Sequence, residues 1–121
     1  MPKIDIEKTK KYYEVHKPCD CYYCKNYISK IKEACPLIYE YLESIGIDPL
    51  KPFELLAFDF EDRIEYICQY VVFGECNKKD EEIIISINDI NICINNTNHP
   101  NTDILDKHFV IDFGPIYLSY N

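Results

Sequence analysis

The sequence predicts an α+β fold: an N-terminal strand, two consecutive helices or one kinked helix, and then a mainly antiparallel sheet of about five further strands. Two patterns carry this prediction. Apolar residues recur with the 3.6-residue period of a helix between residues 22 and 45, and with the two-residue period of a strand in much of residues 53–120. Because the strands follow one another instead of alternating with helices, an antiparallel sheet with helices on one face is favoured over a parallel α/β layout.

The first predicted strand covers residues 9–16. Tyr13 and Val15 alternate there with charged residues, which is typical of a half-buried strand. Pro18 then interrupts the pattern, so we expect a loop before the first helix.

The helical pattern spans residues 22–34 and continues after Pro36. Asp20 is a plausible N-cap for the first helix, because its short side chain can accept a hydrogen bond from an unpaired amide. Pro36 suits the first turn of a second helix, and Gly46 can end that helix in the left-handed conformation. The apolar face of the first helix consists of Cys24, Tyr27, Ile28, Ile31 and Cys35.

Alternating apolar residues define the strands of the sheet. Residues 53–60 and 64–73 are joined by a short polar interval and are expected to form a hairpin. The alternation slips by one residue at Asn88 and Asp89, which predicts a bulge or a tight turn there. The later strands are predicted at residues 83–87, 90–94, 109–113 and 116–120.

Composition and charge restrict the class of protein. With 121 residues, 47% of them apolar, the chain is expected to form one domain spanning residues 1–121. Its net charge of −8 repels phosphate backbones, so nucleic-acid binding is disfavoured. The sequence has neither a secretory signal nor a membrane-length apolar run, so we expect a cytoplasmic protein without membrane contact, whose seven cysteines are thiols or metal ligands.

Three cysteines within six residues are the sharpest local feature. Cys19, Cys21 and Cys24 can occupy adjacent corners of a zinc tetrahedron, because a C-x-x-C turn brings two sulfurs together. A closed zinc site needs a fourth ligand, for which Cys35 is the preferred candidate and His16 the alternative. Further candidates for this ligand are Cys68, Cys76 and Cys93.

Two other interpretations of the cysteines stay open. Cys24 and Cys35 also fit the apolar helix face as small buried residues, and Cys68 and Cys93 fit the alternating strands in the same way. Alternatively, Cys21 and Cys24 flank a helix N-terminus, where the helix dipole favours a reactive thiolate. The predicted meander supplies no parallel βαβ unit, however, so a thioredoxin-like oxidoreductase is not supported.

The sequence favours a non-enzymatic protein, because it contains no nucleophile-elbow serine and no glycine-rich phosphate loop. Its acidic balance and eleven tyrosines instead suggest a protein-binding domain, immunity-like or regulatory, that presents an acidic, tyrosine-bearing face to a basic partner. The tyrosines expected at the surface are Tyr12, Tyr22, Tyr39, Tyr117 and Tyr120. The carboxylates of residues 54–65 are expected to protect a sheet edge by their charge, and the oligomeric state is left open.

Two segments resemble a family of small uncharacterised bacterial proteins. Residues 20–27 match a D-C-x-x-C-x-N-aromatic pattern, and residues 46–54 match a G-[IV]-D…K-P-x-E pattern, with a weaker similarity over residues 109–113. The resemblance implies the same domain limits but no activity. It also implies that Cys21, Cys24, Asn26 and Tyr27 belong to the family pattern and that Cys19 is an addition.

Overall fold

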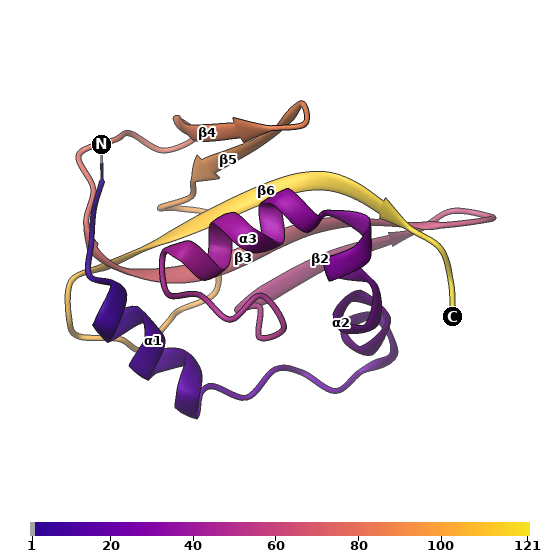
Figure 1. Cartoon of the computed structure of the whole chain (residues 1–121), viewed down its shortest axis with the longest axis horizontal. Helices are drawn as coiled ribbons and strands as arrows, with labels where there is room; N and C mark the ends of the chain where they lie inside the picture. The colour runs from indigo at the N-terminus through magenta and orange to yellow at the C-terminus, as the bar shows by residue number, and fades with distance from the viewer. Residues whose placement is uncertain (1) are drawn as a thin grey trace.

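The computed structural model describes residues 2–121 and confirms the predicted α+β class (Figure 1). In chain order the elements are β1 (Lys3–Ile4), α1 (Ile6–Val15), α2 (Tyr22–Ala34), α3 (Pro36–Ser44), β2 (Glu54–Asp59), β3 (Ile64–Glu75), β4 (Ile83–Ile87), β5 (Ile90–Ile94) and β6 (His108–Leu118). The two predicted consecutive helices are α2 and α3, and Pro36 is in the first turn of α3 as expected.

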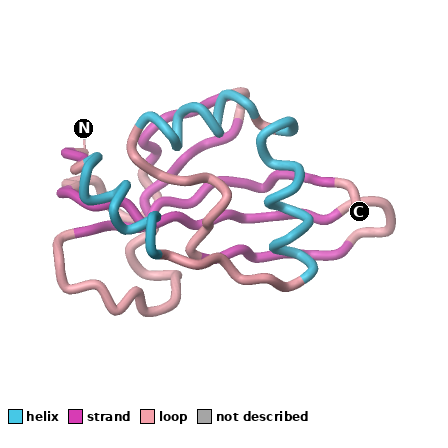
Figure 2. Tube along the Cα trace, turned by 60° about the horizontal axis from the view of Figure 1, so that its bottom comes forward, coloured by secondary structure: helices cyan, strands magenta, loops and turns pink. Residues whose placement is uncertain are grey.

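The strands within the described residues form one antiparallel, curled sheet (Figure 2). Their order is β1-β3-β6-β5-β4, and β2 also pairs with β3. The long central strand β3 therefore pairs with β2 over its first half and with β1 near its end, while β6 lies along its other side. As a result, β2 and β4 are both edge strands.

The predicted hairpin is present, and the predicted bulge or tight turn at Asn88 and Asp89 is the turn of a second hairpin. In the first, β2 and β3 pair in continuous register from Glu54 opposite Gln69 to Asp59 opposite Ile64. In the second, β4 and β5 are joined by a tight turn at Asn88 and Asp89, whose φ angles are 50° and 64°. Asparagine and aspartate tolerate this left-handed conformation better than other side chains. The slip in the apolar alternation arises because these two turn residues separate the strands.

The predicted strand over residues 9–16 is wrong, because most of this segment belongs to helix α1. Asp5 caps the helix by accepting a hydrogen bond from the Lys8 N–H at 3.0 Å. Thr9 and Tyr13, four residues apart, are the buried positions, whereas Val15 is 79% exposed. The alternation of Tyr13 with Val15 therefore did not mark a buried face, and the N-terminal strand is the shorter β1.

The two predicted final strands are one strand, β6, which continues through Gly114 and Pro115. A bulge accommodates them: the register between β3 and β6 shifts between Tyr66 and Cys68. Gly114 has a φ angle of 142°, and a Cβ atom there would lie 2.7 Å from the backbone oxygen of Tyr66. Glycine thus allows close approach of the backbones, so that the strand bends without ending.

Helices α2 and α3 lie over one face of the sheet, where they form the main core together with Tyr13 of α1 (Figures 1 and 2). Its centre contains fully buried side chains from α2, α3 and the two longest strands, namely Tyr27, Ile31, Leu42, Tyr66, Tyr70 and Phe113. A smaller cluster of Val71, Phe73 and Val110 lies on the other face, with Phe53 and Ile104 packed against it.

Within the described residues, no helix has both the length and the apolar content needed to cross a membrane, and the longest, α2, has 13 residues.

Candidate metal centre

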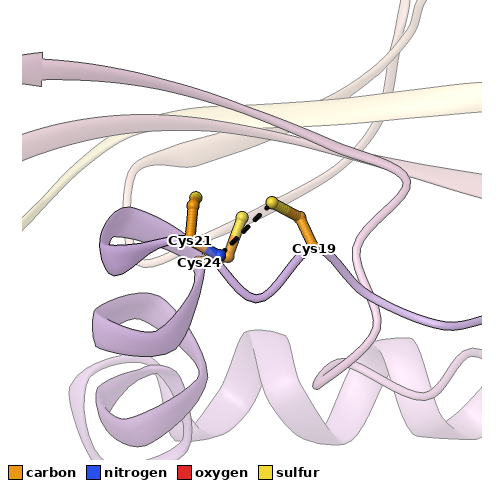
Figure 3. Close-up of side chains that lie close together, drawn as sticks. All are labelled: Cys19, Cys21 and Cys24. Atoms are coloured by element: carbon orange, nitrogen blue, oxygen red, sulfur yellow. Dashed lines mark hydrogen bonds between the residues drawn. The ribbon is translucent and has the colours of Figure 1, made fainter.

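The three clustered cysteines meet at the start of α2 (Figure 3). Cys21 is the N-cap residue of this helix, Cys24 lies in its first turn, and Cys19 lies in the loop before it. Their sulfur atoms all lie within 4.8 Å of one another. The Cys21 N–H donates a hydrogen bond to the Cys19 sulfur at 3.4 Å, so the backbone bends around the sulfurs.

Contacts with the sheet hold the first turns of α2 in place. The Tyr66 hydroxyl, from β3, donates to the backbone oxygen of Tyr23 at 2.7 Å. Asn26, which is fully buried, donates from Nδ2 to the backbone oxygen of Ser119 at 3.0 Å. The Tyr23 hydroxyl also donates to the Asp59 carboxylate at 2.7 Å. The cysteine cluster therefore lies at a helix end that hydrogen bonds hold to β3, to the segment after β6 and to the end of β2.

The environments of the sulfurs differ. The backbone N–H of Cys24 is the main cause that lowers the pKa of the Cys21 thiol, and the Cys19 side chain contributes in the same direction. Burial raises the pKa of the Cys24 thiol, and the neighbouring sulfurs of Cys21 and Cys19 raise it further. Crowded sulfurs of this kind cannot all be thiolates unless a cation compensates their charge, and a bound metal ion supplies this compensation.

Neither candidate for the fourth ligand joins the cluster. Cys35 caps the opposite end of α2, eleven residues after Cys24, which corresponds to about 16 Å along the helix axis. The ring of His16 lies against other groups, with Nδ1 3.3 Å from the Tyr12 hydroxyl and Nε2 3.3 Å from the Pro52 backbone oxygen. Among residues 2–121, the structure gathers three metal-binding side chains at this point and not four.

The remaining cysteines lie apart from the centre. Cys68 is fully buried in the main core, and burial raises the pKa of its thiol. Cys76 and Cys93 are half-buried. Burial of Cys24 and Cys68 agrees with the interpretation of these residues as small apolar side chains, whereas Cys35 and Cys93 are only half-buried.

Of the residues that position the site, Asn26 was named in the sequence only as part of the family pattern, and Tyr23 and Tyr66 were not singled out. Asn26 and Tyr27 follow Tyr23 by three and four residues, so the three side chains share one face of a helix. This spacing could have placed them on the face that contacts the sheet. Tyr66 gives no such signal, because its contact with Tyr23 joins residues 43 positions apart.

Comparison of the chain with protein-family models, curated proteins and solved structures found no match. The fold and the cysteine cluster together define a small α+β protein with a candidate three-cysteine metal centre.

Proposed function

We propose that this protein binds one thiophilic metal ion, with zinc as the favoured metal, through Cys19, Cys21 and Cys24. The observation that carries the proposal is the convergence of the three sulfurs within 4.8 Å. Zinc binds thiolates at about 2.3 Å in a tetrahedron, so three sulfurs this close together can share one ion.

The surroundings of the sulfurs support a cation at this point. The backbone N–H groups of Cys24 and Tyr23 lower the pKa of the Cys21 thiol, and the Cys21 N–H donates a hydrogen bond to the Cys19 sulfur. N–H groups at a helix N-terminus favour negative charge, so they stabilise the thiolate form that a metal requires. Thiolate ligands in turn select soft or borderline ions such as zinc over magnesium or calcium.

Elemental analysis of the purified, zinc-exposed and dialysed protein tests the proposal. We expect about one zinc ion per chain, because three adjacent thiolates dominate the affinity of such a site. Cys21→Ser and Cys24→Ser should each lose the metal. Cys35→Ser and Cys93→Ser are matched controls and should keep it, because neither residue joins the cluster.

Circular dichroism of each variant separates loss of metal from loss of fold. Metal-free wild-type protein after zinc exposure would contradict the proposal, as would zinc that persists when all three clustered cysteines are replaced by serine. If the reduced protein binds no zinc but readily forms a Cys21–Cys24 disulfide, the thiol-redox interpretation of the same sulfurs gains support instead.

A second proposal, protein binding without catalysis, is favoured by an uncovered region of the sheet face opposite the helices. Phe58, Glu65 and Tyr117 lie opposite one another on β2, β3 and β6 and thus share this face. The exposed apolar side chains of this region include Leu56 at 40%, Phe58 at 48% and Tyr117 at 49% exposure. Adjacent to them, β2 presents an edge on which no described strand is paired.

The charge of this region indicates the kind of partner. Residues 54–65 contain five carboxylates and a single cation, Arg63, whose guanidinium lies 4.9 Å from the Tyr117 ring centre. A second copy of the chain would place like charges opposite one another. An extended segment with apolar and basic side chains, added as a strand to β2, complements both the charge and the apolar surface.

Not all of the tyrosines expected at the surface are exposed. Tyr117 and Tyr22 are exposed, at 49% and 47%, whereas Tyr39 is buried in the main core. Tyr12 and Tyr120 are half-buried.

Amide chemical shifts on addition of an alternating lysine–valine peptide test this second proposal. We expect shifts in β2 that weaken with added salt, and little response to a glutamate–valine peptide. Phe58→Glu should weaken the response, because it places a charge in the apolar surface. Leu105→Glu, at a fully exposed position elsewhere, is the control. Equal binding of both peptides, or absence of binding, would contradict the proposal.

A further inference from the structure

We infer that a metal ion in the three-cysteine cluster takes its fourth ligand from outside the chain, and that this ligand is a neutral imidazole nitrogen. The inference rests on the proposed metal-binding function. It adds the chemical class of the group that completes the site, and it makes the cluster an attachment point instead of a closed structural centre.

The internal candidates for the fourth ligand, Cys35 and His16, are held in fixed positions. Cys35 is separated from the cluster by the length of α2, and the helix is held at its start by Asn26 and Tyr66. His16 would have to leave both Tyr12 and Pro52 to reach the sulfurs. Completing the tetrahedron with Cys35 or His16 therefore requires breaking contacts that fix the helix or the histidine.

The cysteine cluster opens toward solvent. Cys24 is buried, with 8% exposure, whereas Cys19 and Cys21 are exposed. The closed side of the sulfur triangle is consequently the protein side, and the open side faces solvent. A tetrahedral ion bound by three sulfurs keeps its fourth position on that open side, as in zinc sites that exchange a ligand.

The charge of the completed metal site favours a neutral fourth ligand. Three thiolates around a divalent cation carry a net charge of −1, on a chain whose own net charge is −8. A fourth thiolate would make the local charge −2, and no cationic side chain among residues 2–121 is buried to offset it. An imidazole nitrogen adds a strong ligand without adding charge.

Cobalt substitution tests the inference, because the visible spectrum of Co²⁺ reports its ligands and geometry. We expect the cobalt-loaded protein to change its spectrum saturably when imidazole is added. A small thiol at the same concentration should have a weaker effect, for the charge reason given above. Cys35→Ser and His16→Ala should leave the starting spectrum and the imidazole response unchanged.

Two sources of the imidazole are distinguished by the size of the cobalt-loaded protein. If a second copy supplies it, cobalt should produce a dimer, and His99→Ala should abolish that dimer. His99 is the candidate because His108 has both ring nitrogens in contacts, with Thr102 and with the Asp106 backbone. If another molecule supplies it, the cobalt protein stays monomeric and responds to free imidazole.

The outcomes separate this inference from the function on which it rests. Absence of cobalt and zinc binding would remove the metal centre and the inference together. Cobalt binding in a monomer that ignores imidazole, or a spectrum altered by Cys35→Ser or His16→Ala, would overturn only the inference. Preferential binding of the thiol would overturn the choice of a neutral ligand.

Discussion

The hydroxyl of Tyr70 connects a helix, a strand and a loop inside the core. It donates to the Pro49 backbone oxygen at 2.6 Å and lies 2.8 Å from the Tyr27 hydroxyl. Because the Pro49 oxygen can only accept, the Tyr70 proton must point to it, and Tyr27 must donate to Tyr70. Both rings are fully buried, so each hydroxyl depends on this chain of hydrogen bonds.

Tyr70→Phe is therefore expected to destabilise the protein more than Tyr27→Phe. Loss of the Tyr70 hydroxyl leaves two buried groups unpaired, the Tyr27 hydroxyl and the Pro49 oxygen, at a cost of about 2 to 4 kcal/mol. Loss of the Tyr27 hydroxyl leaves the bond to Pro49 intact and should cost about 1 kcal/mol. Urea unfolding of the two variants measures the difference, and equal costs would contradict the assigned direction of the hydrogen bonds.

Thr9 connects helix α1 to the sheet through two polar contacts. This fully buried residue donates from its hydroxyl to the Asp5 backbone oxygen at 2.8 Å and accepts from the Phe73 N–H at 3.1 Å. Phe73 belongs to β3, and its N–H lies just beyond the residues that pair with β1. Thr9 therefore supplies a hydrogen-bond acceptor where the pairing with β1 ends. The helix follows β1 directly and continues its contact with the edge of β3.

Thr9→Val should cost about 1 to 3 kcal/mol, because valine has nearly the same shape but leaves the Phe73 N–H without an acceptor. Asp5→Ala removes the helix cap and should cost about 1 kcal/mol. Hydrogen exchange distinguishes the two variants. The Phe73 amide should lose protection in Thr9→Val and keep it in Asp5→Ala, and the reverse order would show that α1 is held in another way.

Burial of tyrosines in the core as a whole links stability to alkaline pH. Burial raises the pKa values of Tyr13, Tyr27 and Tyr70 well above the ordinary value of 10.0. In the unfolded chain these hydroxyls ionise near pH 10, so above that pH the unfolded state binds fewer protons than the folded state. Their contribution to stability is thus complete below about pH 9 and declines as the pH rises beyond about 10.

We expect the free energy of unfolding to fall steeply above about pH 10, and the tyrosinate absorbance of the buried rings to appear together with loss of circular dichroism. Tyr13→Phe should make this decline shallower, because one shifted group is removed. Ionisation of all eleven tyrosines before any loss of structure would contradict the expected coupling.

Prediction from sequence succeeded where neighbouring residues decide the structure. The periodicities of α2, α3 and the two hairpins are local, and so are Pro36 and the Asn88–Asp89 turn. The convergence of Cys19, Cys21 and Cys24 is also local, since a helix start brings residues this close in sequence together.

The errors arose where distant segments decide. Whether Tyr13 belongs to a strand or a helix depends on the hydrogen bond between Thr9 and Phe73 of β3, 64 residues apart. Whether β6 ends at Gly114 depends on the bulge that it forms opposite Tyr66. For the same reason, the sequence could nominate Cys35 or His16 as a fourth ligand but could not place either beside the cluster.

The chain's order of residues thus fixed its class, its hairpins and the three adjacent sulfurs, because each depends on hydrogen bonds and turns within a few residues. The tertiary structure decided which face of each element is buried, which residues hold α2 against the sheet, and that the sulfur triangle opens to solvent. These features depend on contacts between residues tens of positions apart, such as Tyr66 with Tyr23 and Asn26 with Ser119, which no local pattern encodes.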